Sequence, residues 1–286
     1  MAKDTFFCPK KTLNFRGKII NLSSPLVMGI LNITPDSFYE PSRSLKQMDA
    51  IRRAEQCLSE GAAVLDIGGA SSRPGAGIIA TNEEQERLLP ALKGIVRTFP
   101  EAIISVDTYH ASTARAAIEH GAHMINDISA GSIDPSMFKT VAELQVPYVI
   151  MHMKGTPANM QENPVYGHLI KDIAGFFAEK IRQLRDAGVH DLIIDPGFGF
   201  GKTLEQNYQL LSNLDYFTMF DLPVLVGFSR KSMINKVLAC KPEDALHGST
   251  VLNTIALDKG AHILRVHDVK AAVDAVKISQ VYQGQK

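Results

Sequence analysis

Short apolar runs recur eight times along the chain, and most of them are followed by a longer segment with helical spacing. The runs are nearly continuous in Val, Ile and Leu, a pattern typical of parallel strands that are buried on both faces. They span residues 26–33, 63–69, 102–108, 122–128, 146–152, 191–197, 222–228 and 261–267. The pattern therefore predicts a parallel sheet covered by helices.

Three of the intervening segments carry clear helical signals. The first, "SLKQMDAIRRAEQCLSEG", places apolar side chains near one face, and Gly61 suits its C-terminal cap. These apolar residues are Leu45, Met48, Ile51 and Leu58. In the second segment, Thr81 and Glu84 form the pattern of a capping box. The third, residues 168–187, is predicted as one long helix that ends at Gly188.

Eight strands that alternate with helices within 286 residues predict a single-domain α/β protein, a (β/α)8 TIM barrel. A doubly wound open sheet is the alternative. No linker, charge block or low-complexity tract divides the chain. The barrel is assigned to residues 26–286. Residues 1–25, with a weak strand signal in "TLNFRGKII", are assigned to an N-terminal extension that covers the bottom or edge of the barrel.

The composition indicates an aliphatic core and no net charge. Hydrophobic residues make up 45% of the chain and aromatic residues 7%, with no Trp. Thirty basic residues balance thirty acidic ones, so no net field attracts nucleic acid or an anionic membrane. The N-terminus lacks the apolar run of a signal peptide or anchor, and Cys8, Cys57 and Cys240 form no CxxC spacing. We therefore expect a cytoplasmic protein with small-molecule substrates and no nucleic-acid or membrane partner.

Polar residues end each of the eight apolar runs. They are Asn32, Asp66, Asp107, Asn126 with Asp127, His152, Asp195, the triplet 229–231, and Arg265 with His267. Any one of them could be a cap or a loop hydrogen-bond partner. Because the carboxyl ends of barrel strands meet at one mouth, where barrel enzymes hold their active sites, the set together predicts one pocket. We expect Asn126 to face this pocket, Asp127 to be structural, and His152 to be a core histidine.

The residue types at these ends suit a ligand with two different parts. The carboxylates of Asp107 and Asp195 can each accept two parallel hydrogen bonds from a flat, amidine-like edge. Cationic and imidazole side chains suit a separate anionic part, and the ends of the last two strands are where barrels often hold phosphate. These side chains are Arg73, Lys231, Arg265 and His267.

The segment "IIDPGFGFGKT", residues 193–203, looks like a phosphate-binding loop but fails the Walker A pattern, because position 196 is Pro where the first glycine is required. Glycines 197, 199 and 201 instead predict a sharp backbone turn that presents Phe198 or Phe200 toward a ligand. Lys202 is expected to be either a solvated loop cation or the partner of an aspartate.

An ordered set of motifs from Leu26 to Val276 resembles the dihydropteroate synthases, the pterin-binding barrel family. The motifs are "GILNITPDSF", "DIGGASSRPGA", "ISVDT", "INDISAG", "VIMHMKGTPANMQ", "IIDPGFGFGKT", "GFSRKSMI" and "RVHDV". The resemblance implies a transferase of folate biosynthesis and a target of sulfonamides. Its reaction condenses 6-hydroxymethyl-7,8-dihydropterin pyrophosphate with p-aminobenzoate by SN1-like displacement.

The resemblance also implies roles for matching residues. The pterin-binding residues are Asp107, Asn126, Ile128, Met151, Asp195 and Lys231. The p-aminobenzoate site is bordered by Ser72, Arg73, Pro74, Phe200 and Ser229. The pyrophosphate contacts are Asn32, Arg73, Arg265 and His267, and Asn32 is also a ligand of Mg²⁺. The catalytic residues are Arg73, Lys231, Arg265 and His267. A homodimer is implied as well.

Two segments depart from the family pattern. The first motif continues as Tyr-Glu-Pro-Ser at 39–42, where Ser-Asp-Gly-Gly is common. The second reads Ala-Ser-Ser-Arg-Pro at 70–74, where Glu-Ser-Thr-Arg-Pro is common. Two other functions therefore stay open: a catalytically silent pterin-binding paralogue, and a corrinoid-linked pterin methyltransferase domain. The methyltransferase has no need for the anion motifs "SRKS" and "RVHD".

Overall fold

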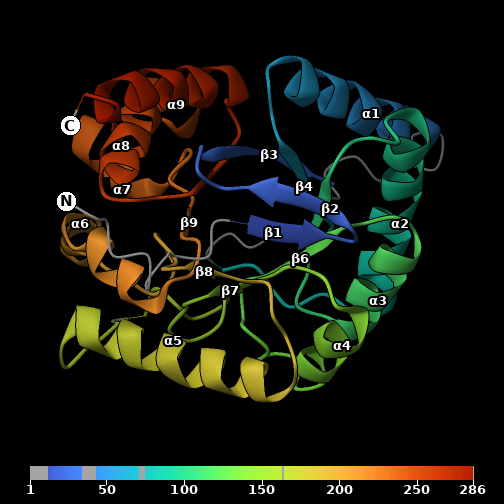
Figure 1. Ribbon diagram of the computed structural model, residues 1–286, viewed down its shortest axis with the longest axis horizontal. Coiled ribbons are helices and arrows are strands. Elements are labelled where there is room, and N and C mark those ends of the chain that lie inside the picture. Colours follow the sequence, from blue (N-terminus) through green and yellow to red (C-terminus); the bar gives the residue numbers. More distant parts are fainter. Residues whose placement is uncertain (1–11, 34–42, 71–74, 163, 286) are drawn as a thin grey trace, which may run out of the picture.

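The computed structural model describes residues 12–33, 43–70, 75–162 and 164–285, and a sheet of eight parallel strands forms its centre (Figure 1). The strands are β3 (Leu26–Asn32), β4 (Val64–Gly68), β5 (Ile104–Asp107), β6 (Met124–Asp127), β7 (Tyr148–Met151), β8 (Leu192–Asp195), β9 (Leu225–Val226) and β10 (Ile263–Val266). Each lies within one of the eight predicted runs. They pair in the order β8-β7-β6-β5-β4-β3-β10-β9, and a parallel bridge between Ile194 and Val224 brings the two edges together. The sheet is thus nearly closed, which confirms the prediction of a single TIM-like α/β domain.

Helices surround this barrel in sequence order (Figure 1). They are α1 (Arg43–Ser59), α2 (Thr81–Thr98), α3 (Ala111–Glu119), α4 (Met137–Leu144), α5 (Leu169–Asp186), α6 (Leu204–Ser212), α7 (Ser232–Leu238), α8 (Leu246–Asp258) and α9 (Val269–Gln283). Short 3₁₀ helices at Leu214–Phe220 and Pro242–Asp244 lie in the described connections. The predicted ends of α1 and α5 are confirmed, because Gly61 and Gly188 have φ of +100° and +87°.

The predicted capping box at the start of α2 is wrong. The residue before the helix is Ala80, without a side-chain cap, so Thr81 already lies inside the first turn. Glu84 is buried, and its Oε2 accepts a hydrogen bond of 2.8 Å from Thr108 Oγ1 beyond the end of β5. The carboxylate therefore joins the helix to the barrel and does not fold back on its own N-terminus.

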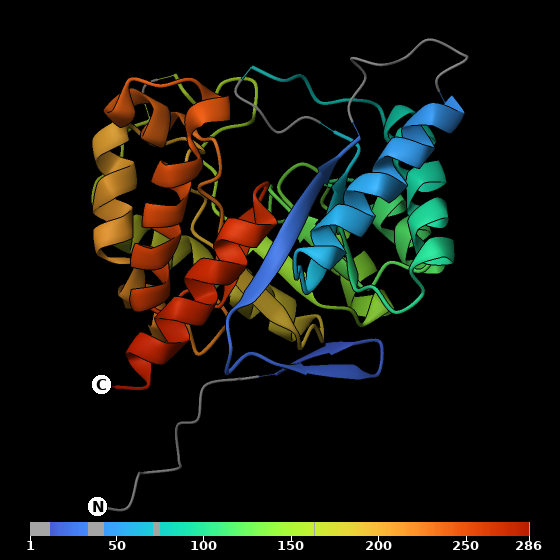
Figure 2. The same ribbon diagram turned by 90° about the horizontal axis from the view of Figure 1, so that it is seen from above.

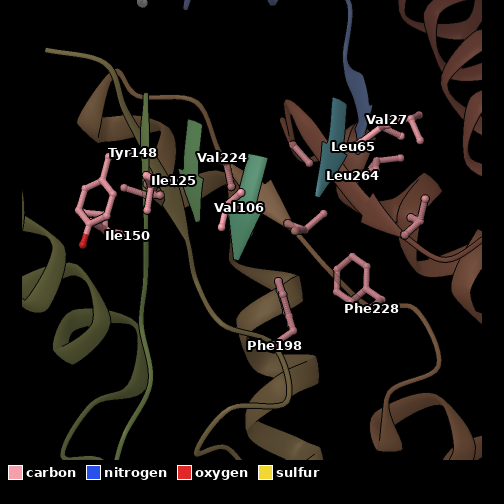
Figure 3. Packing of buried hydrophobic residues seen from close by; sticks show 14 of the residues in the cluster. Val27, Leu65, Val106, Ile125, Tyr148, Ile150, Phe198, Val224, Phe228 and Leu264 are labelled. Atoms are coloured by element: carbon pink, nitrogen blue, oxygen red, sulfur yellow. The ribbon is translucent and has the colours of Figure 1, made fainter. Parts of the chain in front are cut away.

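The core has two layers because side chains alternate across each strand. Outward-facing residues pack between the strands and the helices, among them Val27, Leu65, Val106 and Ile150 (Figure 3). Inward-facing residues fill the floor of the barrel: Met28, Val64, Ile103, Met124, Val149, Ile193, Leu225 and Ile263. Gly29 of β3 lets α1 and α9 approach closely, since an added Cβ would lie 3.1 Å from both Cys57 Sγ and Val269.

A hairpin of β1 (Thr12–Phe15) and β2 (Lys18–Asn21) lies across the end of the barrel where the strands begin (Figure 2). Its buried side chains Leu13 and Phe15, with Leu22, join the same apolar cluster as the floor residues. This end is therefore closed by apolar packing, and polar chemistry is left to the carboxyl ends of the strands. A domain boundary between residues 25 and 26 stays a prediction.

Candidate active site

One arginine connects three strands at the carboxyl end of the barrel. Arg265 of β10 donates through Nε to Asp66 Oδ2 of β4 at 2.6 Å and through Nη2 to Asp107 Oδ2 of β5 at 2.7 Å. Asp66 Oδ2 also accepts from Asn126 Nδ2 of β6 at 3.1 Å. Four of the strand-end residues thus form one hydrogen-bonded network, and both acidic members are buried.

Burial dominates the electrostatics of this network. It raises the pKa of the Asp107 carboxyl to about 7, against the opposing effect of the Arg265 guanidinium. One guanidinium lies between two carboxylates here, and the negative charge of Asp66 raises the pKa of Asp107 further. Burial opposes the charge of Arg265, but Asp66 and Asp107 together raise its pKa above the usual value. Arg265 therefore carries a positive charge near neutral pH.

Asp195 and Lys231 form a second polar group beside the network. Asp195 Oδ1 accepts from the backbone N–H of Gly197 at 2.8 Å. Burial raises the pKa of Asp195, whereas nearby Lys231 opposes that shift. Lys231 Nζ donates to Phe198 O at 2.5 Å and lies 4.6 Å from the ring centroid of Phe200. Burial lowers the pKa of Lys231 to about 8, with Asp195 acting in the opposite direction.

The glycine-rich segment makes the predicted sharp turn. Gly197, Gly199 and Gly201 have φ of +72°, +81° and +61°, a region that favours glycine. At Gly197 an added Cβ would lie 1.9 Å from His152 O, so the loop passes directly against the end of β7. The segment is therefore a tight turn at the barrel mouth.

The two aromatic residues of the turn point to different places. Phe198 is fully buried in the outer core, with its ring centroid 4.5 Å from that of Phe228 (Figure 3). Phe200 instead belongs to a small apolar cluster at the barrel mouth, together with Tyr109, Ile128, Met151 and Met160. Of the two predicted candidates, Phe200 is the one that borders the site.

Ser229 and His267 meet at the ends of β9 and β10. Ser229 Oγ lies 3.1 Å from His267 Nδ1 and accepts from the backbone N–H of His267 at 3.2 Å. Burial, assisted by Arg230 and Arg265, lowers the pKa of His267 to about 4. The imidazole is therefore neutral near pH 7, and it can offer a hydrogen bond to an anion but no charge. Arg230 turns away and pairs with Asp268 at 3.0 Å.

Other candidates from the sequence lie at the rim or outside the described part of the chain. Asn32 is exposed at the end of β3, opposite Gly68 in the register with β4. Ser72, Arg73 and Pro74 lie outside the described residues, as does the altered segment 39–42. Within the part of the chain that the structure describes, no group of three or more His, Cys, Asp or Glu side chains could hold a metal ion.

The structural assignments of Asp127 and His152 are confirmed. Asp127 accepts hydrogen bonds from Ser129, Gly131 and Tyr148, which satisfy its carboxylate below the site. His152 is buried with its ring against Phe176, and burial lowers its pKa to about 2. Asp107 does not cap the next helix, because the residue before α3 is His110.

Asp66 was predicted to lie with the other strand-end residues but was given no role, and the position of Lys202 was missed. The signal for a role of Asp66 was an acidic residue inside an apolar run, which must find partners in the barrel interior. Lys202 was expected to be solvated or paired with an aspartate, and this is wrong. Its side chain is buried, and its hydrogen-bond partners within the described residues are His152 and backbone carbonyls.

The fold and the site together define a class of protein: a (β/α)8 barrel enzyme with a polar, charged site at the carboxyl ends of its strands. The sequence profile of the family described as pterin binding enzyme matches residues 28–267. Dihydropteroate synthase of Escherichia coli (strain K12) is 43% identical over 265 residues, which cover 92% of this chain and 93% of that protein. The enzyme of Haemophilus influenzae is 42% identical over 265 residues, covering 92% and 96%.

Solved structures agree with these relatives. The Yersinia pestis dihydropteroate synthase with a sulfonamide drug complex has a TM-score of 0.90 at 42% identity, covering 96% of this chain and 99% of that chain. The Xanthomonas albilineans enzyme with 4-aminobenzoic acid has a TM-score of 0.88 at 39% identity, covering 96% and 98%. This chain belongs to the dihydropteroate synthase family of pterin-binding enzymes, whose members are transferases.

Proposed function

We propose that this chain condenses 6-hydroxymethyl-7,8-dihydropterin pyrophosphate with p-aminobenzoate, giving 7,8-dihydropteroate and pyrophosphate. The observation that carries the proposal is the network in which Arg265 bridges Asp66 and Asp107 beside Asn126. It combines acceptors for a flat N–H-rich ring with a cation for an anionic group. Among the solved relatives, one Xanthomonas albilineans structure is a complex with 7,8-dihydropteroate.

The pterin is proposed to lie between the two carboxylates. Asp195 and Asp107 accept hydrogen bonds from the guanidine-like edge and ring N–H groups, and Asn126 and Lys231 complete the polar contacts. Ile128 and Met151, both buried at the barrel mouth, cover the ring. The raised pKa values of both carboxyls are consistent with such a role, because a ligand that donates hydrogen bonds restores part of the solvation that burial removes.

The pyrophosphate is proposed to lie toward Arg265, His267 and Asn32, with Arg73 from the undescribed loop. The side-chain oxygen of Asn32 fits one ligand position of Mg²⁺, which prefers oxygen ligands and keeps phosphate oxygens and waters as the others. Bound there, Mg²⁺ would supply positive charge to the leaving group. Arg265 stabilises the charge that develops on the pyrophosphate, and neutral His267 contributes a hydrogen bond.

The reaction then follows an SN1-like course. The bond between the pterin methylene carbon and the pyrophosphate oxygen breaks ahead of attack, and the electron-rich ring stabilises the cation-like carbon. The amine nitrogen of p-aminobenzoate forms the new C–N bond and releases its proton to solvent. An aniline nitrogen is already unprotonated at neutral pH, so the site needs no strong base, and positioning supplies much of the rate. Phe200 and Ser229, with Ser72, Arg73 and Pro74, are proposed to border this amine.

We also propose that the protein is a cytoplasmic homodimer with residues 1–25 as an extension of the barrel. No helix in the described ranges is long and apolar enough to cross a membrane. Exposed large apolar side chains gather on α7, α8 and α9 and support a subunit interface there: Val237, Leu238, Leu246, Val251, Ile255, Ile278, Val281 and Tyr282. Val251→Asp should yield monomers in sedimentation velocity, whereas Ile19→Asp on the hairpin should not.

Turnover tests the main proposal. Purified protein is incubated with the dihydropterin pyrophosphate, p-aminobenzoate and Mg²⁺, and both products are followed. Product that disappears with EDTA and returns with added Mg²⁺ is the expected result. Tight binding of the pterin pyrophosphate without product would favour the silent paralogue and point to segments 39–42 and 70–74. Asp195→Ala should abolish pterin binding and Arg265→Ala should slow the reaction, whereas unchanged values would place the ligand elsewhere.

A further inference from the structure

The residues Gly201, Lys202 and Thr203 at the end of the glycine-rich segment have no role in the proposed reaction. The side chains of Lys202 and Thr203 are nevertheless both hydrogen-bonded. Thr203 Oγ1 accepts from the backbone N–H of Gln206, and the Gln206 side chain accepts from the backbone N–H of Thr203. This capping box fixes the start of α6. Lys202 points the other way, into the protein, where only 2% of it is exposed.

Lys202 Nζ joins the turn to the end of β7. It donates to Gly197 O at 2.9 Å and to Phe200 O at 3.0 Å, the first and fourth residues of the turn. It also lies 3.1 Å from His152 Nδ1 and 3.4 Å from His152 O. Since the imidazole of His152 is neutral, its Nδ1 can act as the acceptor.

All of these partners are neutral, which is unusual for a buried lysine. Its burial lowers the pKa of Lys202 to about 7, and the charge of Asp195 opposes that shift. Protonated or neutral, a buried amine needs hydrogen-bond partners, because a buried polar group without them is strongly disfavoured. The side chain therefore constrains both the turn and the β7 end that it joins.

Two residues of the proposed substrate site, Phe200 and Lys231, depend on the part of the turn that Lys202 holds. Phe200, whose carbonyl accepts from Lys202, presents its ring to the apolar cluster at the mouth. Phe198 O, between the two anchored carbonyls, accepts from Lys231 Nζ. The peptide of Gly199 is held separately, by Gln161 at its carbonyl and by Asn207 at its N–H. Lys202 is thus the one side chain described here that ties both ends of the turn to a neighbouring strand.

We propose that Lys202 is a positioning residue for the second substrate: its buried side chain, anchored on His152, sets the turn of residues 197–201 so that the Phe200 ring borders the p-aminobenzoate site. This inference rests on the proposed function. It assigns Lys202 no contact with either substrate, and its effect on the amine passes through Phe200.

The test compares Lys202→Met, which keeps the length of the side chain but removes every N–H donor, with Lys93→Met on the exposed face of α2. The KM for p-aminobenzoate and the Kd of the dihydropterin pyrophosphate are measured separately. We expect Lys202→Met to raise the KM about tenfold or more and to change the Kd less than about threefold, and Lys93→Met to change neither. A KM that is unchanged, or a Kd that rises as much as the KM, would overturn the proposal.

A double-mutant cycle with Phe200→Ala separates positioning from general loss of stability. If Lys202 acts through Phe200, Lys202→Met should raise the KM for p-aminobenzoate no further in the Phe200→Ala background. Fully additive effects would refute this route. Wild-type turnover is measured first, because its absence would defeat the proposed function, whereas normal wild-type turnover with an unaffected variant would defeat only this inference.

A second variant covers the case in which Lys202→Met does not fold. His152→Phe removes the Nδ1 acceptor but leaves the three carbonyls, including that of residue 152, in place. It should raise the KM for p-aminobenzoate about threefold without changing the Kd of the pterin substrate. An unchanged KM in a folded His152→Phe protein would show that the anchoring on β7 does not position the turn.

Discussion

Asp66→Asn is the sharpest test of the network in the barrel mouth. Asp66 is completely buried, and its Oδ2 alone accepts from Arg265 Nε at 2.6 Å and Asn126 Nδ2 at 3.1 Å. Asparagine has the same shape, so the substitution leaves no cavity, and its amide oxygen can still accept both hydrogen bonds. It removes the negative charge and puts an amide NH2 in place of Oδ1, which has no hydrogen-bond partner among the described residues. The experiment therefore tests the need for a charged acceptor at this position.

The expected magnitude follows from the two hydrogen bonds. A bond to a charged group contributes roughly 1.5–3 kcal/mol, against about 0.5–1.5 kcal/mol for a neutral pair. The bond from Asn126 becomes a neutral pair and loses about 1–1.5 kcal/mol, whereas the bond from Arg265 keeps its charged donor and loses at most the same amount. The total cost is therefore about 1–3 kcal/mol, while Arg265 keeps its contact with Asp107. Because about 1.4 kcal/mol is a factor of ten, kcat/KM for the pterin pyrophosphate should fall about tenfold to a hundredfold if the whole effect reaches the site.

Urea unfolding and steady-state kinetics measure the two consequences on the same preparation. Asp49→Asn is the matched control, because Asp49 also pairs with an arginine, Arg52 at 3.3 Å, but both side chains are about two-thirds exposed. Such a pair contributes little, so neither stability nor rate should change. If Asp66→Asn behaves like this control, the buried carboxylate does not position Arg265, and our reading of the network is refuted.

Three further predictions concern the turn and the titrating groups. Gly197→Ala should abolish use of p-aminobenzoate, because its Cβ would lie 1.9 Å from His152 O. Gly188→Ala has a similar φ but nothing within 4 Å of the added Cβ, so it should lower only the melting temperature. Equal KM values for the two variants would contradict this prediction. Since the Asp107 carboxyl has a pKa of about 7 and is a full acceptor only when ionised, calorimetry should show pterin affinity falling as the pH drops below that value, and a flat profile would count against its role. The Lys231 ammonium, with a pKa of about 8, loses its proton as the pH rises, so kcat/KM should decline on the alkaline side; Lys231→Arg should remove that decline, and its persistence would assign it to another group.

Much of the fold was determined by local patterns in the sequence. Continuous apolar runs predicted strands buried on both faces, and all eight were found. The glycines of "GFGFG" predicted a backbone turn, because residues without a Cβ adopt the positive φ values that such a turn requires. The ordered motifs indicated the family, and the barrel topology then required their polar ends to meet at one mouth.

The tertiary structure decided which side chains pair across that mouth. Arg265 and its partners Asp66 and Asp107 are 199 and 158 residues apart in the sequence, so their contact depends on strand register and tilt, which apolar patterning leaves unspecified. For the same reason Lys202 could not be assigned. A lysine after a glycine turn is solvated by default, and only the packing of the turn against β7 gives it buried acceptors.

The failed capping box at Thr81 and Glu84 has the same origin. The Glu84 side chain can accept a hydrogen bond either from the N-terminus of its own helix or from the barrel, and the local sequence does not distinguish the two. The barrel offers Thr108 Oγ1 in a buried position, where a carboxylate must have a partner. Local sequence determined the elements and their order, whereas the long-range hydrogen bonds that build the site were set by how the strands and helices pack.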